Sequence, residues 1–218
     1  MKNLNLKAFI YILLGLSATL GFIIAILTGL DISKLWDFIK ILPTVATIDL
    51  IFLGVFIKWG WRWKVFQGWL VPFADLNGTW QGSIQTTWKK PETGETPGPI
   101  PTILTIKQTF TKISCVMRTA EMTSYSFAEQ FKLDKDNQIR QLAYSYTSKP
   151  KPAITDRSIP HEGTIIFDII GKPLSKLKGH YWTARKSTGE ITLTFREMKL
   201  LDEMPDDLGP HPVSSVDK

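Results

Sequence analysis

Tyrosine and arginine side chains share faces of predicted β-strands in the second half of the chain. Alternation along one predicted strand places Arg140 on the same face as Tyr144 and Tyr146, and alternation along another places Tyr181 with Arg185. Aromatic rings stack on bases at about 1–3 kcal/mol each, and guanidinium groups pair with phosphates through charge-assisted hydrogen bonds. These residue types therefore suit a ligand that combines bases with phosphates.

Eight residues are candidates for binding such a ligand. They are Arg118, Tyr125, Arg140, Tyr144, Tyr146, Tyr181, Arg185 and Arg196. Along residues 123–133, alternation puts Tyr125 on one face with Phe131 and Leu133, and along the last strand it puts Phe195 in the core and Arg196 on the other face. The competing interpretation is that these tyrosines and arginines cover the outside of a small barrel.

The residues that could perform catalysis or bind a metal are dispersed. No spacing indicates a Ser/His/Asp or Cys/His arrangement, and the three histidines are too far apart in the sequence to suggest a metal site. The single cysteine, Cys115, cannot form an internal disulfide and is interpreted as a small buried apolar residue. We therefore expect no catalytic residues, no metal, no cofactor and no enzymatic activity.

Two apolar segments near the N-terminus predict helices that cross a membrane. Residues 8–30 carry no charge, and a span needs about 20 such residues. A signal peptide and a buried core helix are the alternatives, but the segment is longer than a signal h-region. A second apolar segment, 41–57, follows a connector too short to be a domain, so the two helices should form an antiparallel hairpin.

The distribution of positive charge predicts how the hairpin is oriented. Lys2 and Lys7 precede the first helix, and a cluster of tryptophans with lysine and arginine follows the second at residues 58–64. Such clusters are typical of the headgroup level, and positive charge is concentrated on the cytoplasmic side. We expect a multi-pass membrane protein with both termini in the cytoplasm.

Asp49 lies inside the second apolar segment. A carboxylate at the centre of a membrane helix costs on the order of 2.5–3.5 kcal/mol on insertion scales. Either the hairpin satisfies it, for example through Thr44 or Thr47, or it faces other copies of the chain or a water path. Asp49 is thus a candidate for the membrane function.

From Asp75 onward, alternating and β-branched runs separated by turn residues predict an all-β domain. Short connections between sequential strands favour a closed, eight-stranded, up-and-down antiparallel barrel, with a two-sheet sandwich as the alternative. The expected strands are 78–88, 102–110, 112–119, 123–133, 138–147, 163–170, 176–185 and 190–198.

The expected organisation has three parts: a membrane anchor with its linker at 1–74, a cytoplasmic barrel at 75–201 and an acidic, disordered tail at 202–218. The chain has a formal net charge of +6. This excess suits a membrane surface or a phosphate-bearing ligand, but it is too dispersed to indicate binding to a DNA or RNA polymer.

The order of these features resembles a known family. The hairpin is followed by Asn77-Gly78-Thr79-Trp80, a Gly-x-Trp opening similar to that of lipocalin-type barrels, and later by the segments 177–182 and 189–195. The arrangement resembles the two-transmembrane β-barrel effectors of bacterial cyclic-oligonucleotide anti-phage systems (CBASS). No ligand-binding residue of that family is carried over here.

The resemblance implies a function in anti-phage defence. A partner cyclase of the CD-NTase class would make a cyclic dinucleotide on infection, and the barrel would bind it. The protein would then self-associate and disrupt the lipid bilayer of the inner membrane. Two alternatives remain open: a membrane-tethered, lipocalin-like carrier or scaffold for an apolar molecule, and an unrecognised membrane-bound enzyme.

Overall fold

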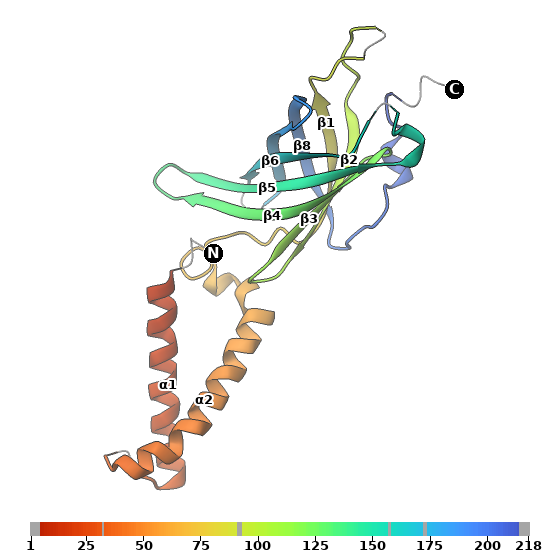
Figure 1. Ribbon diagram of the computed structural model, residues 1–218. Helices are drawn as coiled ribbons and strands as arrows, with labels where there is room; N and C mark the ends of the chain where they lie inside the picture. Colours follow the sequence, from red (N-terminus) through yellow and green to blue (C-terminus); the bar gives the residue numbers. More distant parts are fainter. Residues whose placement is uncertain (1–4, 32, 91–92, 157, 172–173, 214–218) are drawn as a thin grey trace. The chain divides into compact units, whose positions relative to one another are not determined.

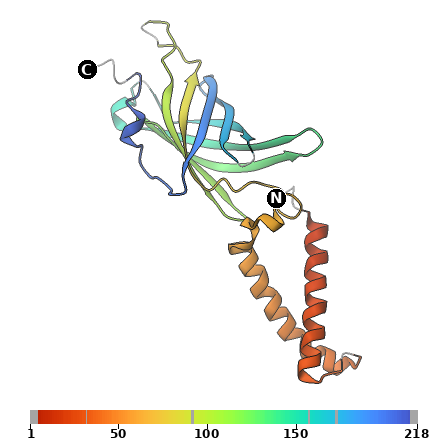
Figure 2. The ribbon, with the colours of Figure 1, turned by 180° about the vertical axis from the view of Figure 1, so that it is seen from behind.

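The computed structural model describes residues 5–31, 33–90, 93–156, 158–171 and 174–213. The chain divides into two compact units, one that extends to Phe73 and one that begins at Ala74. The first unit contains the helices α1 (Leu6–Thr28) and α2 (Leu35–Lys58), and the second contains the β-strands (Figures 1 and 2). The expected pair of apolar helices followed by a β-rich domain is confirmed.

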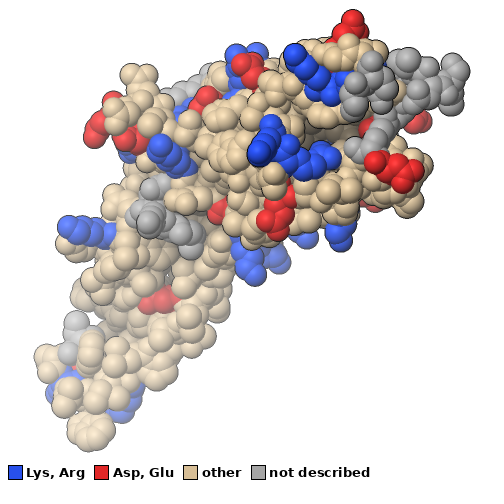
Figure 3. Space-filling model, turned by 45° about the horizontal axis from the view of Figure 1, so that its top comes forward, with Lys and Arg blue, Asp and Glu red and all other residues tan. Residues whose placement is uncertain are grey.

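Helices α1 and α2 leave most of their apolar surface exposed. Both are long and apolar enough to cross a membrane. Within them only Ala25, Ile41 and Val45 are buried, in a small cluster where the two helices pack together. Figure 3 shows charged side chains spread over the barrel unit and long uncharged stretches on the helical unit. This surface argues against the core helices of a soluble protein and suggests association with a membrane.

The carboxylate of Asp49 is bound by the other helix of the hairpin. Ser17 Oγ of α1 donates a hydrogen bond of 2.6 Å to Asp49 Oδ2. The sequence suggested Thr47 as a partner, but Thr47 Oγ1 donates instead to the carbonyl of Pro43. Asp49 Oδ1 is buried and has no hydrogen-bond partner among the described residues. The hairpin thus satisfies one of the two carboxylate oxygens.

Eight antiparallel strands form one closed barrel in sequence order. Each strand pairs with the next, and β8 pairs with β1 to close the sheet, which excludes the two-sheet sandwich. The predicted up-and-down barrel is therefore confirmed. The strands are β1 (Gly78–Thr86), β2 (Ile100–Gln108), β3 (Ile113–Arg118), β4 (Met122–Asp134), β5 (Ile139–Pro150), β6 (His161–Ile170), β7 (Lys176–Thr183) and β8 (Thr188–Glu197).

The Gly-x-Trp segment seals one end of the barrel. Gly78 has φ of +126°, and a Cβ there would lie 2.7 Å from the carbonyl oxygen of Glu197, so the turn requires glycine. Trp80 is fully buried, and its Nε1 donates a 2.9 Å hydrogen bond to the carbonyl of Leu76, which is buried as well. Leu76 and Trp80 belong to the central apolar cluster, so this end of the barrel is a packed floor.

Gln108 holds the chain against this floor. Its side chain accepts a 2.7 Å hydrogen bond from the amide of Leu76 and donates a 3.0 Å hydrogen bond to the carbonyl of Ala74. We predict that Gln108→Ala lowers the free energy of unfolding by about 1–3 kcal/mol, because two backbone groups lose their partner. Thermal denaturation of the full chain in detergent should show a lower Tm, by roughly 3–10 °C.

Gln141 provides the matched control for Gln108. It is partly exposed on the outside of the barrel, where its side chain donates to Asp168. Gln141→Ala should change the free energy of unfolding by less than about 0.5 kcal/mol. Equal destabilisation by the two variants would contradict the role assigned to Gln108.

A β-bulge changes which side chains of β4 face the interior. The register of β4 against β5 shifts between Ser126 and Ala128. Simple alternation placed Tyr125 on the same face as Phe131, but the extra residue reverses the faces on either side of it. Phe131 packs against the core, whereas Tyr125 is exposed. The expected shared face is therefore wrong.

Phe195 also differs from the expectation. It was predicted to lie in the core with Ile191 and Leu193, which are both buried. The register of β1 against β8 shifts next to Trp80, the partner of Phe195. Phe195 packs edge-on against Trp80 with ring centroids 5.3 Å apart but is 41% exposed. Phe195 thus faces the same side as Trp80, its cross-strand partner, but it lies near the end of β8 and stays partly exposed.

The acidic C-terminal segment makes defined contacts with the barrel as far as residue 213. Asp207, within a short 3₁₀ helix (Asp206–Leu208), pairs with Arg196 through two contacts of 3.0 and 3.1 Å. His211 is buried. The expectation of a disordered tail thus differs from the structure over residues 202–213, because acidic composition did not reveal these partners. Residues 214–218 lie outside the described residues.

Candidate functional site

The end of the barrel opposite Leu76 and Trp80 contains a cavity of about 160 Å³. In an up-and-down barrel, alternate connections lie at the same end, so the links β1–β2, β3–β4, β5–β6 and β7–β8 meet there. Each of these links contributes lining residues, for example Trp88, Glu121, Ser158 and Arg185. We call this cavity the mouth pocket.

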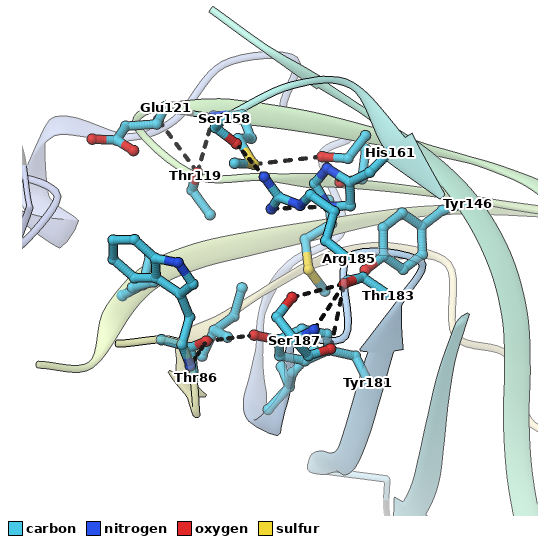
Figure 4. Close-up of a pocket in the computed structure, with 18 of the residues that line it drawn as sticks. Thr86, Thr119, Glu121, Tyr146, Ser158, His161, Tyr181, Thr183, Arg185 and Ser187 are labelled. Atoms are coloured by element: carbon cyan, nitrogen blue, oxygen red, sulfur yellow. Dashed lines mark hydrogen bonds between the residues drawn. The ribbon is translucent and has the colours of Figure 1, made fainter. Parts of the chain in front are cut away.

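The inner wall of the mouth pocket is apolar and aromatic. Ile84, Ile165 and Ile191 line it together with Tyr146 and Tyr181. Burial raises the pKa of both tyrosines, so both phenols are neutral hydrogen-bond donors at physiological pH. Figure 4 shows the two tyrosine side chains among the residues that line the pocket. The wall therefore offers two rings for stacking and two hydroxyl groups for hydrogen bonds.

Tyr181 is fixed in place by β1. Its hydroxyl donates a 2.9 Å hydrogen bond to Thr86 Oγ1 at the end of β1. Tyr181 lies on β7, so this bond joins strands on either side of β8. The ring is consequently held in position before any ligand arrives, which reduces the ordering cost of stacking.

Arg185 is the cation at the rim of the pocket. Its Nη1 donates a 2.9 Å hydrogen bond to Ser158 Oγ, and its Nη2 lies 3.4 Å from His161 Nε2 (Figure 4). Desolvation lowers the pKa of the guanidinium, while the phenols of Tyr146 and Tyr181 act in the opposite direction. A guanidinium remains charged at neutral pH even so. The β5–β6 loop thus positions one fixed positive charge beside the aromatic wall.

His161 is held in its neutral form next to that charge. Desolvation lowers its pKa, and the nearby charge of Arg185 lowers it further, while the contact with Ile159 raises it. The geometry agrees, because Nδ1 lies 3.0 Å from the carbonyl of Ile159, to which it donates, and Nε2 faces a guanidinium donor. This assigns the proton to Nδ1.

We predict that His161 makes the stability of the barrel dependent on pH. Its pKa in the folded state lies below the usual 6.5, so the unfolded chain binds more protons in the window between the two values. Its contribution to stability is complete above pH 6.5 and is lost as the pH falls through that window. The Tm of the full chain in detergent, measured from about pH 7.5 to about pH 5, should therefore decrease.

Two substitutions separate His161 from the other titrating groups. His161→Gln should reduce the decrease in Tm, because the variant has no imidazole to protonate. His180→Gln should retain it, because His180 is exposed on β7 and does not line the pocket. A decrease as steep in His161→Gln as in the unaltered chain would contradict the assignment.

A second charged contact lies elsewhere in the mouth. Glu121 of the β3–β4 turn and His211 of the C-terminal segment both line the pocket, and each is only 7% exposed. His211 Nδ1 lies 3.1 Å from Glu121 Oε1. The amide nitrogen of Val213 lies 3.3 Å from the same Nδ1. If Nδ1 carries a proton, it can donate to the carboxylate but cannot accept from this amide, and the contact with the carboxylate is the shorter of the two. Nδ1 therefore donates to the carboxylate.

The mouth pocket brings together three of the eight residues proposed from sequence: Tyr146, Tyr181 and Arg185. Tyr144 points into the barrel but is buried in the core, with its ring 6.3 Å from that of Phe167. Its hydroxyl has no hydrogen-bond partner among the described residues. Tyr144 thus supports the pocket from the core and does not line it.

The other four candidates lie away from the pocket. Tyr125 is exposed, with Lys149 Nζ 5.9 Å from its ring centroid. Arg118 Nη1 donates to the carbonyl of Leu201 at 3.3 Å. Arg196 pairs with the C-terminal segment, and Arg140 is partly buried on β5 outside the lining. Strand alternation identified the interior face of β5 and β7 but did not indicate which residues reach the open end.

Several lining residues were not among the sequence candidates. They are chiefly Trp88, Glu121, Ser158, His161 and His211. The first four lie on alternate connections of the predicted barrel or next to them, and the topology alone brings those connections together. No comparable signal exists for His211, because nothing in the sequence indicates where the C-terminal segment returns to the barrel.

The lining of the mouth pocket combines groups that are suited to binding a ligand. Within the described ranges, no group of three or more His, Cys, Asp or Glu side chains could hold a metal ion. The lining instead combines stacking surfaces, hydroxyl groups and a single Arg or Lys side chain among the described residues, Arg185. This combination fits a ligand with flat rings and a negative charge.

Comparisons with known proteins agree with this geometry. Residues 71–195, more than half of the chain, match the family described as "Cap15, cyclic dinucleotide receptor domain". A protein of Staphylococcus schleiferi named "CD-NTase-associated protein 15" is 27% identical over 155 residues, which cover 71% of this chain and 79% of the relative. The matched family region contains all of β1 to β7 and most of β8.

Proposed function

Because the chain belongs to the Cap15 cyclic dinucleotide receptor domain family, we propose that it binds a cyclic dinucleotide in the mouth pocket and acts as an effector of CBASS anti-phage defence. The observation that carries this proposal is the placement of Arg185 beside the rings of Tyr146 and Tyr181 in one cavity. The family membership confirms the resemblance stated above and gives the ligand class, and the geometry suggests how the ligand is held.

Each part of the ligand has a matching group in the pocket. The rings of Tyr146 and Tyr181 stack on a base, and Arg185 pairs with a phosphate. Hydroxyl groups from Thr86, Ser124 and other lining residues are available to the sugar and phosphate oxygens. Binding of this kind needs no catalytic group, which agrees with the role of a receptor.

The hairpin is the proposed output of the receptor. We infer that α1 and α2 cross the bacterial inner membrane, with both termini in the cytoplasm, where a partner CD-NTase would release the cyclic dinucleotide. Ligand binding then promotes self-association, and the assembled hairpins disrupt the bilayer. The apolar surface of the two helices supports their place in a membrane, and the name of the staphylococcal relative supports a CD-NTase as the partner.

Thermal denaturation of the full chain in detergent tests ligand binding directly. A panel of cyclic dinucleotides at about 100 times the Kd should include one that adds about 2.7 kcal/mol of stability. GMP and AMP at the same concentration serve as controls. The proposal fails if no member of the panel raises the Tm. Chromatography of the nucleotide after incubation distinguishes a receptor, which retains it unchanged, from an enzyme.

The apolar wall keeps one alternative function open. Ile84, Ile165 and Ile191 would also suit a membrane-tethered carrier or scaffold for an apolar molecule. Mass spectrometry of lipids that copurify with the full chain tests this alternative. A stoichiometric lipid that cyclic dinucleotides do not displace would favour the carrier.

A further inference from the structure

The C-terminal segment is anchored along the outside of the barrel before it reaches the mouth. Thr79 Oγ1 donates a 2.6 Å hydrogen bond to the carbonyl of Lys199 and accepts a 3.0 Å hydrogen bond from the amide of Leu201. Thr105 Oγ1 donates at 2.7 Å to the carbonyl of Leu201. These contacts tie the start of the segment to β1 and β2, which leaves the residues after Leu201 to continue toward the mouth (Figure 1).

The end of the segment lines part of the mouth pocket. His211 and Val213 line the same cavity as Tyr146 and Arg185. Within that cavity the imidazole of His211 donates to the buried carboxylate of Glu121, with 3.1 Å between Nδ1 and Oε1. The C-terminal segment thus forms part of the wall of the mouth pocket.

The remaining space is small for the proposed ligand. The cavity measures about 160 Å³, whereas sites for small molecules and cofactors usually measure roughly 300–1,000 Å³. A cyclic dinucleotide has two bases, two sugars and two phosphates and belongs in the larger part of that range. A ligand of that size needs part of the lining to move away from the mouth. His211 and Val213 belong to the C-terminal segment, which can leave without opening a strand of the barrel.

We propose that residues 203–213 are an intramolecular competitor of the ligand: the segment and a cyclic dinucleotide exclude each other from the mouth pocket. The proposal rests on the proposed function. The segment lowers the apparent affinity by the fraction of molecules in which the mouth is open. When His211 leaves, the carboxylate of Glu121 can accept a hydrogen bond from an N–H group of a base.

Isothermal titration of the full chain in detergent with cyclic di-GMP, cyclic di-AMP and cyclic GMP-AMP tests the competition. His211→Ala, and separately a chain that ends after Asp202, should bind the preferred nucleotide more tightly by about tenfold or more, a difference of 1.4 kcal/mol. His180→Ala is the matched control, because His180 is exposed on β7 and lies outside the pocket. Unchanged or weaker binding by both tail variants would overturn the proposal.

Limited proteolysis provides a test that needs no ligand. Glu203 is exposed, but a glutamate-specific protease requires the residues around its target to detach, so docking of the segment slows cleavage there. His211→Ala should be cleaved after Glu203 several-fold faster than His180→Ala. Equal rates would show that the contact with Glu121 does not hold the segment, which overturns the proposal.

Proteolysis with ligand present separates the remaining outcomes. Faster cleavage after Glu203 in the presence of the bound nucleotide supports exclusion of the segment. Slower cleavage means that the segment closes over the ligand, which contradicts competition. If no variant binds any cyclic dinucleotide, the proposed function falls and the competition falls with it, whereas binding that is insensitive to the tail overturns the competition alone.

Discussion

Replacing Arg185 with alanine is expected to weaken binding of the cyclic dinucleotide by about 10- to 150-fold. A hydrogen bond to a charged group is worth about 1.5–3 kcal/mol, and Arg185 is the one Lys or Arg side chain among the described lining residues. Its contacts with Ser158 and His161 position the guanidinium before the ligand arrives. Isothermal titration of the full chain measures the change.

Two further variants make this result specific. Arg185→Lys keeps the charge but loses the planar fork of donors, so its affinity should fall between those of the unaltered chain and Arg185→Ala. Arg140→Ala removes an arginine of β5 that does not line the pocket and should leave the Kd within about twofold. If Arg140→Ala and Arg185→Ala weaken binding equally, general loss of positive charge explains the result and the assigned site is wrong.

Replacing Asp49 with leucine is expected to abolish membrane damage while ligand binding persists. The substitution removes a carboxylate that costs on the order of 2.5–3.5 kcal/mol in the membrane, so the hairpin of α1 and α2 becomes more stable on its own. The unpaired Asp49 Oδ1 is the group available to form new contacts when hairpins associate. Leakage of a dye from vesicles that contain the full chain, measured after addition of the nucleotide, is expected to disappear.

Two further variants, Asp49→Asn and Ser17→Ala, identify what the carboxylate of Asp49 contributes. Asp49→Asn retains hydrogen bonding and should keep part of the leakage. Ser17→Ala removes the 2.6 Å hydrogen bond within the hairpin and should increase leakage, because the carboxylate is then less well held. Unaltered leakage in both Asp49 variants would mean that the residue serves only the packing of the hairpin.

Local patterns were sufficient for most of the fold. The apolar stretches of α1 and α2 and the alternation within each strand are properties of consecutive residues, so both can be read before any contact is known. Short connections then imply antiparallel neighbours, and closure removes the two free edges. The same reasoning placed Tyr146 and Tyr181 in the barrel.

The features that were missed depend on contacts between distant residues. The bulge in β4 adds one residue between Ser126 and Ala128, and nothing in the local pattern marks it. The return of the C-terminal segment depends on hydrogen bonds to Thr79 and Thr105 more than 90 positions earlier. When each strand is considered alone, Arg118 and Arg196 look like ligand-binding cations, yet both bind this segment instead.

The packed floor formed by Leu76 and Trp80 also determines the timing of the response. A barrel sealed at one end loads and empties through the same opening. By detailed balance, a part of the mouth that only obstructs passage slows capture and release by the same factor and leaves the affinity unchanged. Changes at residues 93–96 of the β1–β2 link, which are exposed and outside the lining, would therefore alter how long a signal lasts, whereas the wall and Arg185 set the concentration at which it begins.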